Sequence, residues 1–254
     1  MKKFLMALLF APLTVLASGG AHLDHWPGAV GDKAALQNGA KLFVNYCLNC
    51  HGASHLRYNK LTEIGLTEQQ VKDNLMFTTD KIGEQMRVAA RSDEQKLWFG
   101  ASPPDLTVIS RARASEMGSG ADWLYTYLRS FYRDEKRPTG WNNVVFENVG
   151  MPNVLYELQG QQVLNHETHK LELAVPGKMS PAEYDKAVSD LVSFMVWMAE
   201  PDQEFRKTLG YGVLAFLFVL FLLAYALKKE YWKDIHQSLR GLADGIAGSA
   251  QVGH

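Results

Sequence analysis

The sequence predicts a mainly α-helical fold, in which one domain with long irregular loops is followed by a single membrane-spanning helix. Three observations support this prediction. The 254-residue chain has an apolar segment near each end, helical periodicity at both borders of the region between them, and a middle broken by turn-forming residues. With 47% hydrophobic and 21% charged residues, the composition is that of an ordinary folded protein.

The first segment, residues 1–17, is typical of a secretory signal peptide. Lys2 and Lys3 give it a basic start, an apolar stretch follows, and small residues precede the expected cleavage point after Ala17. A first transmembrane helix is the alternative, but the apolar run is short and no stop-transfer charges follow it. We therefore expect export of the chain that follows, with Gly19–Ala21 leaving room for a slightly later cleavage.

The exported region is expected to begin with a helix over Ala34–Tyr46. Leu36, Ala40 and Phe43 recur there at helical spacing, and the same face continues into the two cysteines of the chain. We expect this helix to pack against the last helix of the domain, which is also strongly patterned.

The middle of the chain, residues 54–177, is broken by clusters of Gly, Pro and Ser. These clusters are Ser102–Pro104, Gly118–Gly120, Pro138–Gly140 and Gly150–Pro152. Between them, Asp122–Phe131 is predicted to be an aromatic-rich helix. The alternation of polar and apolar residues within Val163–Leu173 favours short strands.

The last helix of the domain carries a complete start signal. Ser180 can cap it, Pro181 takes the first helical position, and Glu183 completes a capping box. Met179 and Tyr184 occupy the positions of a hydrophobic staple. An apolar stripe then predicts a helix that ends near residues 200–201.

A second apolar run, Leu209–Leu227, is long enough to cross a membrane. At about 1.5 Å per residue it spans roughly 28 Å, close to the ~30 Å hydrocarbon core of a bilayer. A buried core helix is the alternative, but such helices rarely lack a polar face. More basic residues follow the run than precede it, which places the C-terminus in the cytoplasm. We thus expect a periplasmic domain over 18–205, an anchor over 206–228 and a cytoplasmic tail over 229–254.

The charge distribution gives weaker information about partners. Residues 18–205 contain 24 acidic and 18 basic side chains. This acidity suits steering of a basic partner, or it only keeps the domain soluble, and the sequence leaves both open. No basic stripe accompanies the aromatic residues, so we expect no nucleic-acid partner.

Both cysteines lie in one motif, Cys47-Leu48-Asn49-Cys50-His51. This is the attachment pattern of a c-type haem. Two cysteines three residues apart on a helical turn present their sulfurs to one edge of the haem, where they form thioethers with its vinyl groups. The adjacent His51 reaches the iron from the same side. We therefore expect one covalently attached haem c, with His51 as a metal ligand.

Three other chemistries use similar cysteine spacing. A structural zinc site needs four ligands, and the second pair that His166 and His169 offer lies far along the chain. A thioredoxin-like redox pair has no need of a histidine after it. A disulfide within this motif would close too small a loop to stabilise the fold much. Export and the histidine together favour haem.

An electron-transfer haem usually needs a sixth iron ligand, which methionine or histidine supplies. With the signal peptide, the staple residue Met179 and the last soluble helix set aside, four methionines remain open: Met76, Met86, Met117 and Met151. Met151 has the best setting, because Gly150 permits close backbone approach and Pro152 keeps the loop non-helical. Core filling is the alternative use of a methionine. For the haem propionates, Arg111 and Arg113 are candidate partners, with surface solvation as the alternative.

The order of motifs resembles the cytochrome c1 family, the haem subunits of the ubiquinol–cytochrome c reductase (bc1) complex, in its bacterial form. The matching features, in order, are Cys47–His51, Arg57-Tyr58-Asn59, Pro103–Thr107 with Arg111-Ala112-Arg113, Gly150-Met151-Pro152, and Met179-Ser180-Pro181 leading to Ala199-Glu200-Pro201 and the apolar run. Two positions depart from the family pattern: Trp123 follows Asp122 where a tyrosine is usual, and Asn153 stands where a second proline is common.

The resemblance implies a cytochrome c-like haem domain in which Met151 is the sixth iron ligand, Arg113 contacts a propionate and Pro104 lines the haem pocket. It implies an electron-transfer subunit that is no enzyme by itself. Electrons would come from the Rieske iron–sulfur protein and pass to a cytochrome c acceptor. Cytochrome b would be a further partner, and the complex a dimer in the inner membrane.

Two alternatives stay open at this point. A monohaem subunit of a terminal oxidase, or another membrane-anchored c-type electron carrier, shares the attachment motif, although such proteins more often have an N-terminal anchor. A haem-based sensor or a peroxidase needs an open iron position, which a sixth protein ligand would deny it.

Overall fold

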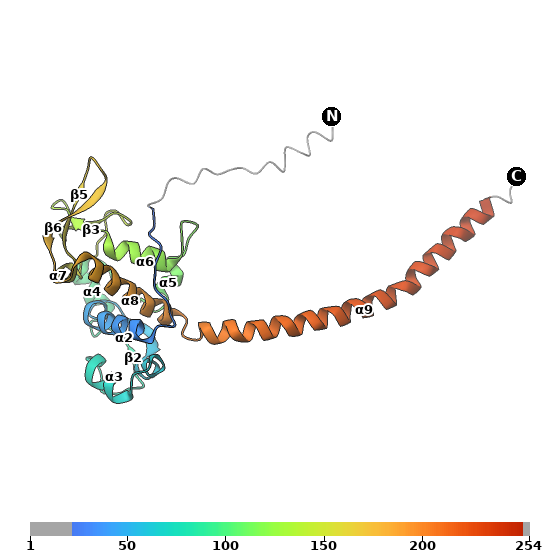
Figure 1. Cartoon of the computed structure of the whole chain (residues 1–254), viewed down its shortest axis with the longest axis horizontal. Helices are drawn as coiled ribbons and strands as arrows, with labels where there is room; N and C mark the ends of the chain where they lie inside the picture. Colours follow the sequence, from blue (N-terminus) through green and yellow to red (C-terminus); the bar gives the residue numbers. More distant parts are fainter. Residues whose placement is uncertain (1–21, 251–254) are drawn as a thin grey trace. The chain divides into compact units, whose positions relative to one another are not determined.

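The computed structural model describes residues 22–250, with side chains described as far as residue 234. The predicted signal peptide, residues 1–17, lies outside the described residues. The chain divides into two compact units with the boundary between Pro201 and Asp202. The first unit is the domain that contains the Cys47–His51 motif, and the second is a single long helix (Figure 1).

Helices are the main elements of the domain, as predicted. In chain order the domain contains α2 (Lys33–Leu42), a π-helical turn η1 (Phe43–Cys47), β1 (Ala53–Arg57), a 3-10 segment η2 (Tyr58–Ile64), α3 (Glu68–Leu75), β2 (Gln85–Met86), α4 (Ser92–Phe99), α5 (Ile109–Ala112), α6 (Gly120–Arg129), β3 (Phe131–Arg133), β4 (Trp141–Asn143), α7 (Tyr156–Gln159), β5 (Gly160–Asn165), β6 (Lys170–Pro176) and α8 (Pro181–Ala199). Among these described elements the strands form three antiparallel pairs, β1 with β2, β3 with β4 and β5 with β6. The short strands expected within Val163–Leu173 correspond to the end of β5 and the start of β6.

The core is built around the crossing of α2 and α8. Gly39 permits the close approach, because a Cβ atom there would lie 2.1 Å from the backbone oxygen of Asp190. The rings of Phe43 and Phe194 meet beside this crossing with centroids 5.5 Å apart. The helix that leads into the cysteine motif and the last helix of the domain therefore pack together, as the sequence patterns predicted.

Capping residues decide where the helices begin. Helix α8 starts at Pro181, and Ser180 and Glu183 form the predicted capping box. Helix α6 was expected over Asp122–Phe131 but runs over Gly120–Arg129, since Ser119 and Asp122 form a capping box of their own. The start is therefore two residues earlier, and the chain after Ser130 leaves the helix to form β3.

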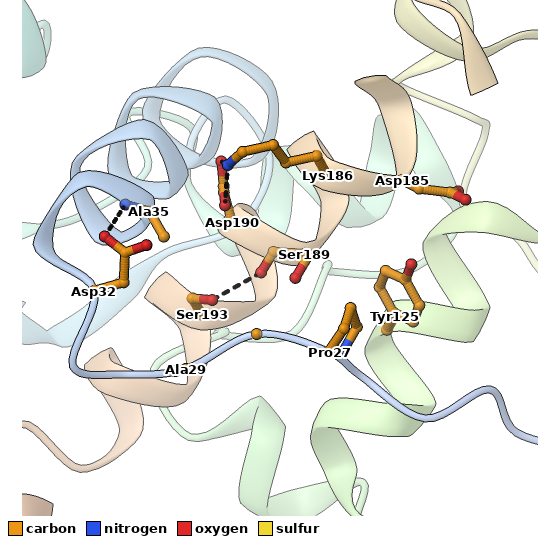
Figure 2. Close-up of a pocket in the computed structure, with 11 residues that line it drawn as sticks. Pro27, Ala29, Asp32, Ala35, Tyr125, Asp185, Lys186, Ser189, Asp190 and Ser193 are labelled. Carbon is orange, nitrogen blue, oxygen red and sulfur yellow. Dashed lines mark hydrogen bonds and ion pairs between the residues drawn. The ribbon is translucent and has the colours of Figure 1, made fainter. Parts of the chain in front are cut away.

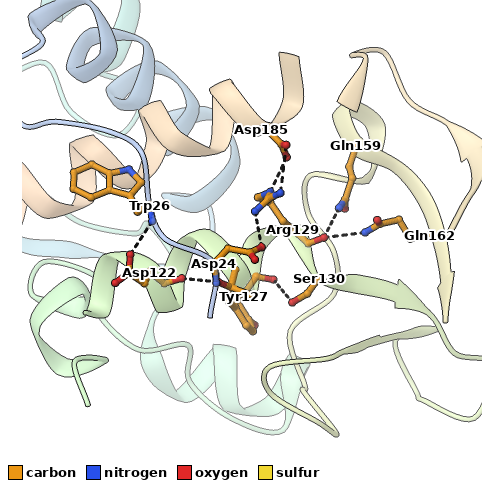
Figure 3. Close-up of polar contacts among 10 residues, drawn as sticks. Asp24, Trp26, Asp122, Tyr127, Arg129, Ser130, Gln159, Gln162 and Asp185 are labelled. Carbon is orange, nitrogen blue, oxygen red and sulfur yellow. Dashed lines mark hydrogen bonds and ion pairs between the residues drawn. The ribbon is translucent and has the colours of Figure 1, made fainter. Parts of the chain in front are cut away.

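An extended segment, residues 22–32, lies across α6 and is called the strap below (Figure 3). The backbone N–H of Trp26 donates to Asp122 Oδ1 at 2.7 Å, and that of Asp24 donates to Thr126 Oγ1 at 2.8 Å. Arg129 then pairs with Asp24 at 2.9 Å and with Asp185 at 2.6 Å. The strap is thereby tied to both α6 and α8.

The second unit is helix α9 (Gln203–Ala250). Its part from Gln203 to Asp234 is long and apolar enough to cross a membrane, and the most apolar stretch has a mean hydropathy of 2.3 with no burial against this chain. The predicted anchor, residues 206–228, falls inside this part. The helix continues beyond the anchor into the segment expected to be the tail.

Candidate functional site

The cysteine motif begins where α2 changes its winding. After Leu42 the helix widens into the π-turn η1, which ends at Cys47. The N–H groups of Cys50 and His51 both donate to the carbonyl of Cys47, at 3.1 and 2.9 Å. These bonds fold the motif into one tight turn. The two cysteines and the histidine are therefore presented from a single rigid turn.

The two cysteines are not joined to each other. Burial, together with the nearby Cys50, raises the pKa of the Cys47 thiol to about 12, so this sulfur stays protonated at neutral pH. Among the described residues no group of three or more His, Cys, Asp or Glu side chains is placed to hold a metal ion. The geometry is compatible with two cysteines that react with a haem edge.

The imidazole of His51 is held in one orientation. Its Nδ1 lies 2.7 Å from the carbonyl oxygen of Pro104, and because a carbonyl only accepts, Nδ1 carries the proton and Nε2 keeps its lone pair. Burial lowers the pKa of His51, against the opposing effects of the Pro104 hydrogen bond and the charge of Asp105. The ring is thus a neutral imidazole with one free nitrogen, which is the form that binds a metal.

Asp105 fixes the segment that holds His51. Its carboxylate accepts hydrogen bonds from the N–H groups of Ser54 at 2.8 Å and of Thr107 at 2.9 Å. Burial alone would raise the pKa of Asp105, but the hydrogen bonds from Thr107 and Ser54 outweigh it and hold that pKa below its ordinary value. Next to this, the N–H of Leu106 donates to the carbonyl of Gly52 at 2.8 Å. The Pro103–Thr107 segment therefore acts as a backbone support for the cysteine motif.

Gln95 gives a second support, which sequence reasoning did not identify. It is 3% exposed, its Nε2 donates to the carbonyl of Cys50 at 2.9 Å, and its Oε1 accepts from Ser102 at 3.0 Å. Helix α4 is thereby tied to the motif through a glutamine. A lone glutamine among exposed residues carries no pattern, so one sequence gives no signal for it.

Met151 lies on a cluster of aromatic side chains. It is half-buried against the core, and the hydroxyl of Tyr127 donates to its sulfur at 3.4 Å. Tyr127 stacks on Trp123 with ring centroids 4.7 Å apart, and the guanidinium of Arg113 lies 4.4 Å from the centre of the Trp123 ring. The structure therefore brings Met151 and Arg113 to one cluster through two residues, Tyr127 and Trp123.

The other methionines left open by the sequence have different surroundings. Met86 is fully buried in β2, and Met117 is 52% exposed. Met76 follows the end of α3 and packs against the core. Within the described residues no hydrogen bond reaches the sulfur of any of these three, whereas the Met151 sulfur accepts one from Tyr127.

The two groups of candidate residues belong to one hydrophobic core. Cys47 and Leu48 lie in the same cluster of buried residues as Trp123 and Tyr127, and Met151 packs against that cluster. Arg111 differs from Arg113, since it is mostly exposed and lies 3.9 Å from Glu200. A turn with two unpaired thiols, an oriented neutral imidazole and a thioether on a non-helical loop together fit a haem c.

A pocket of about 440 Å³ lies elsewhere, between the strap, α2, α6 and α8 (Figure 2). Its carboxylates already have partners within the chain: Asp190 bonds to Asn38 and Lys186, and Asp185 bonds to Arg129. None of the predicted site residues lines it. The pocket is therefore separate from the candidate haem site.

Comparison with known proteins places these features in a family. The model of the Cytochrome C1 family matches residues 27–235. Cytochrome c1 of Allochromatium vinosum is 44% identical over 250 residues, which cover 93% of this chain and 100% of that protein. A Nitrosomonas europaea protein named ammonia monooxygenase gamma subunit is 49% identical over 236 residues, covering 92% and 98%. Cytochrome c1 of Rhodospirillum rubrum is 27% identical over 237 residues, covering 83% and 86%.

Proposed function

Because this chain belongs to the cytochrome c1 family, we propose that it is the haem c subunit of a ubiquinol–cytochrome c reductase, which takes electrons from the Rieske iron–sulfur protein and passes them to a cytochrome c. The observation that carries the proposal is the extent of the family match, which includes the cysteine motif, the Met151 loop and the apolar helix. The Nitrosomonas relative carries another name, yet its identity spans the same regions, so we infer that it is a relative of the same kind.

Six residues of this chain would hold the haem. Cys47 and Cys50 would form the thioethers, His51 Nε2 and Met151 Sδ would be the axial ligands, and Pro104 and Arg113 would line the pocket. When bound, a haem c supplies a one-electron change at iron without making or breaking a substrate bond. With His51 and Met151 both bound to the iron, the site would suit electron transfer rather than catalysis.

The surrounding residues set the properties of this site. The Pro104 carbonyl keeps the His51 ring in one tautomer, which makes its Nε2 a constant ligand. The Tyr127 hydroxyl, whose pKa burial raises, keeps its proton and draws electron density from the Met151 sulfur. Arg113 is held between the rings of Trp123 and Phe146, with its guanidinium 5.6 Å from the second ring. In that position its remaining N–H donors suit a bidentate pair with a propionate.

The apolar part of α9 supports the proposed membrane arrangement. Residues 206–228 would anchor the chain in the inner membrane, with the domain of residues 18–205 in the periplasm and residues 229–254 in the cytoplasm. Residues 1–17 would direct export. The anchor would keep the haem domain near the membrane surface, beside cytochrome b and the Rieske protein, in a dimeric complex.

Isolation from native membranes in mild detergent tests the proposal. A dihaem cytochrome b and a Rieske protein should copurify with this chain in fixed proportion. Recovery of copper-containing oxidase subunits in their place would favour the terminal-oxidase alternative. Rapid binding of carbon monoxide by the native reduced protein would favour a sensor or peroxidase, because it requires an open iron position.

A further inference from the structure

We propose that Arg137 and Asn148 form a clamp that positions Met151 as an iron ligand. The proposal rests on the proposed function, because it presupposes that Met151 binds the iron. Neither residue touches Met151 directly, so both act as positioning residues. Their effect would pass through the backbone of residues 148–151.

Hydrogen bonds hold the side-chain oxygen, the backbone carbonyl and the backbone N–H of Asn148. The guanidinium of Arg137 donates from Nη1 to the Asn148 side-chain oxygen at 2.9 Å and from Nη2 to its backbone carbonyl at 2.8 Å. From the other side, the N–H of Asn148 donates to Asn142 Oδ1 at 2.9 Å. Three hydrogen bonds therefore fix one residue that stands three positions before Met151.

Asn148 needs such support, because its backbone has a positive φ of 61°. The left-handed region is strained for an L-residue other than glycine, and asparagine is among the few that adopt it. The next residue, Val149, is 4% exposed and packs in the core. The turn at Asn148 thus directs the chain from a buried valine into the Met151 loop.

Arg137 is itself held in place by a closed network. The N–H of Arg137 donates to the Asp134 carbonyl at 3.1 Å, and its own carbonyl accepts from Gly140 at 2.9 Å. The Asp134 carboxylate accepts from Asn142 at 3.0 Å, and Asn142 is also the acceptor for Asn148. The β3–β4 connection and the Met151 loop are therefore joined through four polar residues.

Competition between the Met151 sulfur and external ligands for the iron explains why a clamp on this loop would matter. A thioether is neutral and is held by a single bond to iron, so an external ligand competes with it whenever the loop moves away. Fixing the loop beforehand reduces the entropy lost when the sulfur binds. Loosening it should therefore favour external ligands without changing the covalent attachment of the haem.

Imidazole titration of the ferric protein tests the clamp. The full-length protein in detergent would be titrated, and the near-infrared band of the methionine–iron bond followed. We expect Arg137→Gln and Asn148→Ala each to raise the apparent affinity for imidazole about tenfold, equivalent to about 1.4 kcal/mol. Asn148→Gly should do less, because glycine adopts the positive φ without strain. The double variant should exceed the larger single effect only slightly, since both changes break the same contact.

A matched control is available in the same hairpin. Arg133 is exposed and lies over Trp141 with its guanidinium 4.8 Å from the ring centre, and Arg133→Gln removes the same charge without touching Asn148. It should leave the imidazole affinity within twofold of wild type. If Arg137→Gln and both Asn148 variants also stay within twofold, the clamp is refuted while Met151 remains the ligand. If the wild-type protein itself lacks the methionine–iron band, the ligand assignment fails, and the clamp with it.

Discussion

At the scale of single residues, Met151 makes a side-chain contact that its sequence motif does not predict. The sulfur accepts a hydrogen bond from Tyr127, which is itself fixed by stacking on Trp123. A donor on the thioether withdraws electron density from the sulfur. In the proposed haem site this would weaken its donation to ferric iron and favour the reduced state.

Tyr127→Phe should therefore lower the reduction potential of the haem. A neutral hydrogen bond contributes about 0.5–1.5 kcal/mol, which for a one-electron couple limits the shift to roughly 20–60 mV. A redox titration of the purified protein measures it. Tyr125→Phe is the matched control, since this tyrosine lies on the same helix but faces Arg129. An unchanged potential in Tyr127→Phe would show that the hydrogen bond has no influence on the iron.

The candidate ligands could be predicted from the sequence because each lies in a short local pattern. Cys47, Cys50 and His51 are neighbours, and Met151 stands between Gly150 and Pro152. Gln95 and Tyr127 could not be predicted in the same way. Each acts on a residue more than twenty positions away in the chain, through a contact that only the folded core creates.

At the scale of elements, the start of α6 and the strap share one carboxylate. Asp122 accepts hydrogen bonds from Ser119 within the capping box and from the N–H of Trp26 in the strap. Burial by itself would raise the pKa of Asp122, but the hydrogen bonds from Ser119 and Trp26 and the nearby His25 lower it below its ordinary value. One side chain thus joins a helix start to a segment almost a hundred residues away.

Asp122→Asn should lower the free energy of unfolding at neutral pH by about 0.5–2 kcal/mol, the usual range for a lost capping interaction. A carboxylate with a depressed folded-state pKa stabilises the protein above its unfolded pKa of about 3.9, and this contribution disappears as pH falls through the folded value. The difference in the free energy of unfolding between wild type and variant should therefore become smaller below about pH 4. Denaturant unfolding at pH 7 and pH 3 measures this difference. An equal difference at both pH values would exclude a stabilising role of the Asp122 charge.

Gly39→Ala should destabilise the domain although alanine is the better helix former. The new Cβ would lie 2.1 Å from the Asp190 carbonyl oxygen, so α2 and α8 would have to separate, at a cost of about 1–3 kcal/mol. Gly31→Ala is the control, because nothing lies within 4 Å of a Cβ there. Thermal unfolding of both variants decides the point, and a Gly39→Ala protein as stable as wild type would mean that the crossing is looser than described.

The limits of sequence reasoning also differ between elements. Helix α8 could be placed to within a residue, because its cap, first-turn proline and apolar stripe agree. Helix α6 was misplaced by two residues, since Ser119 was counted as part of a glycine-rich turn rather than as a cap. The π-turn η1 and the strap follow from tertiary contacts and have no periodic signal.

At the scale of the whole molecule, the part of the chain that the structure describes divides after Pro201 into a folded domain and the long helix α9. A chain that ends at Pro201 should therefore still fold and acquire haem. We expect it to appear in the soluble periplasmic fraction with the same reduced spectrum as the full-length protein. Cell fractionation with haem staining tests this, and a truncated protein that stays in the membrane fraction would show that the apolar helix is not the sole attachment.

We propose that this chain carries electrons from a Rieske centre to a cytochrome c. The most direct test is the ubiquinol-driven reduction of the haem in the isolated complex, followed by rapid-mixing absorbance with and without an intact Rieske centre. Ubiquinol should reduce the haem rapidly in the intact complex, and loss of the Rieske centre should abolish this reduction while ascorbate still reduces the haem. Reduction by ubiquinol at an unchanged rate without the Rieske centre would contradict the account.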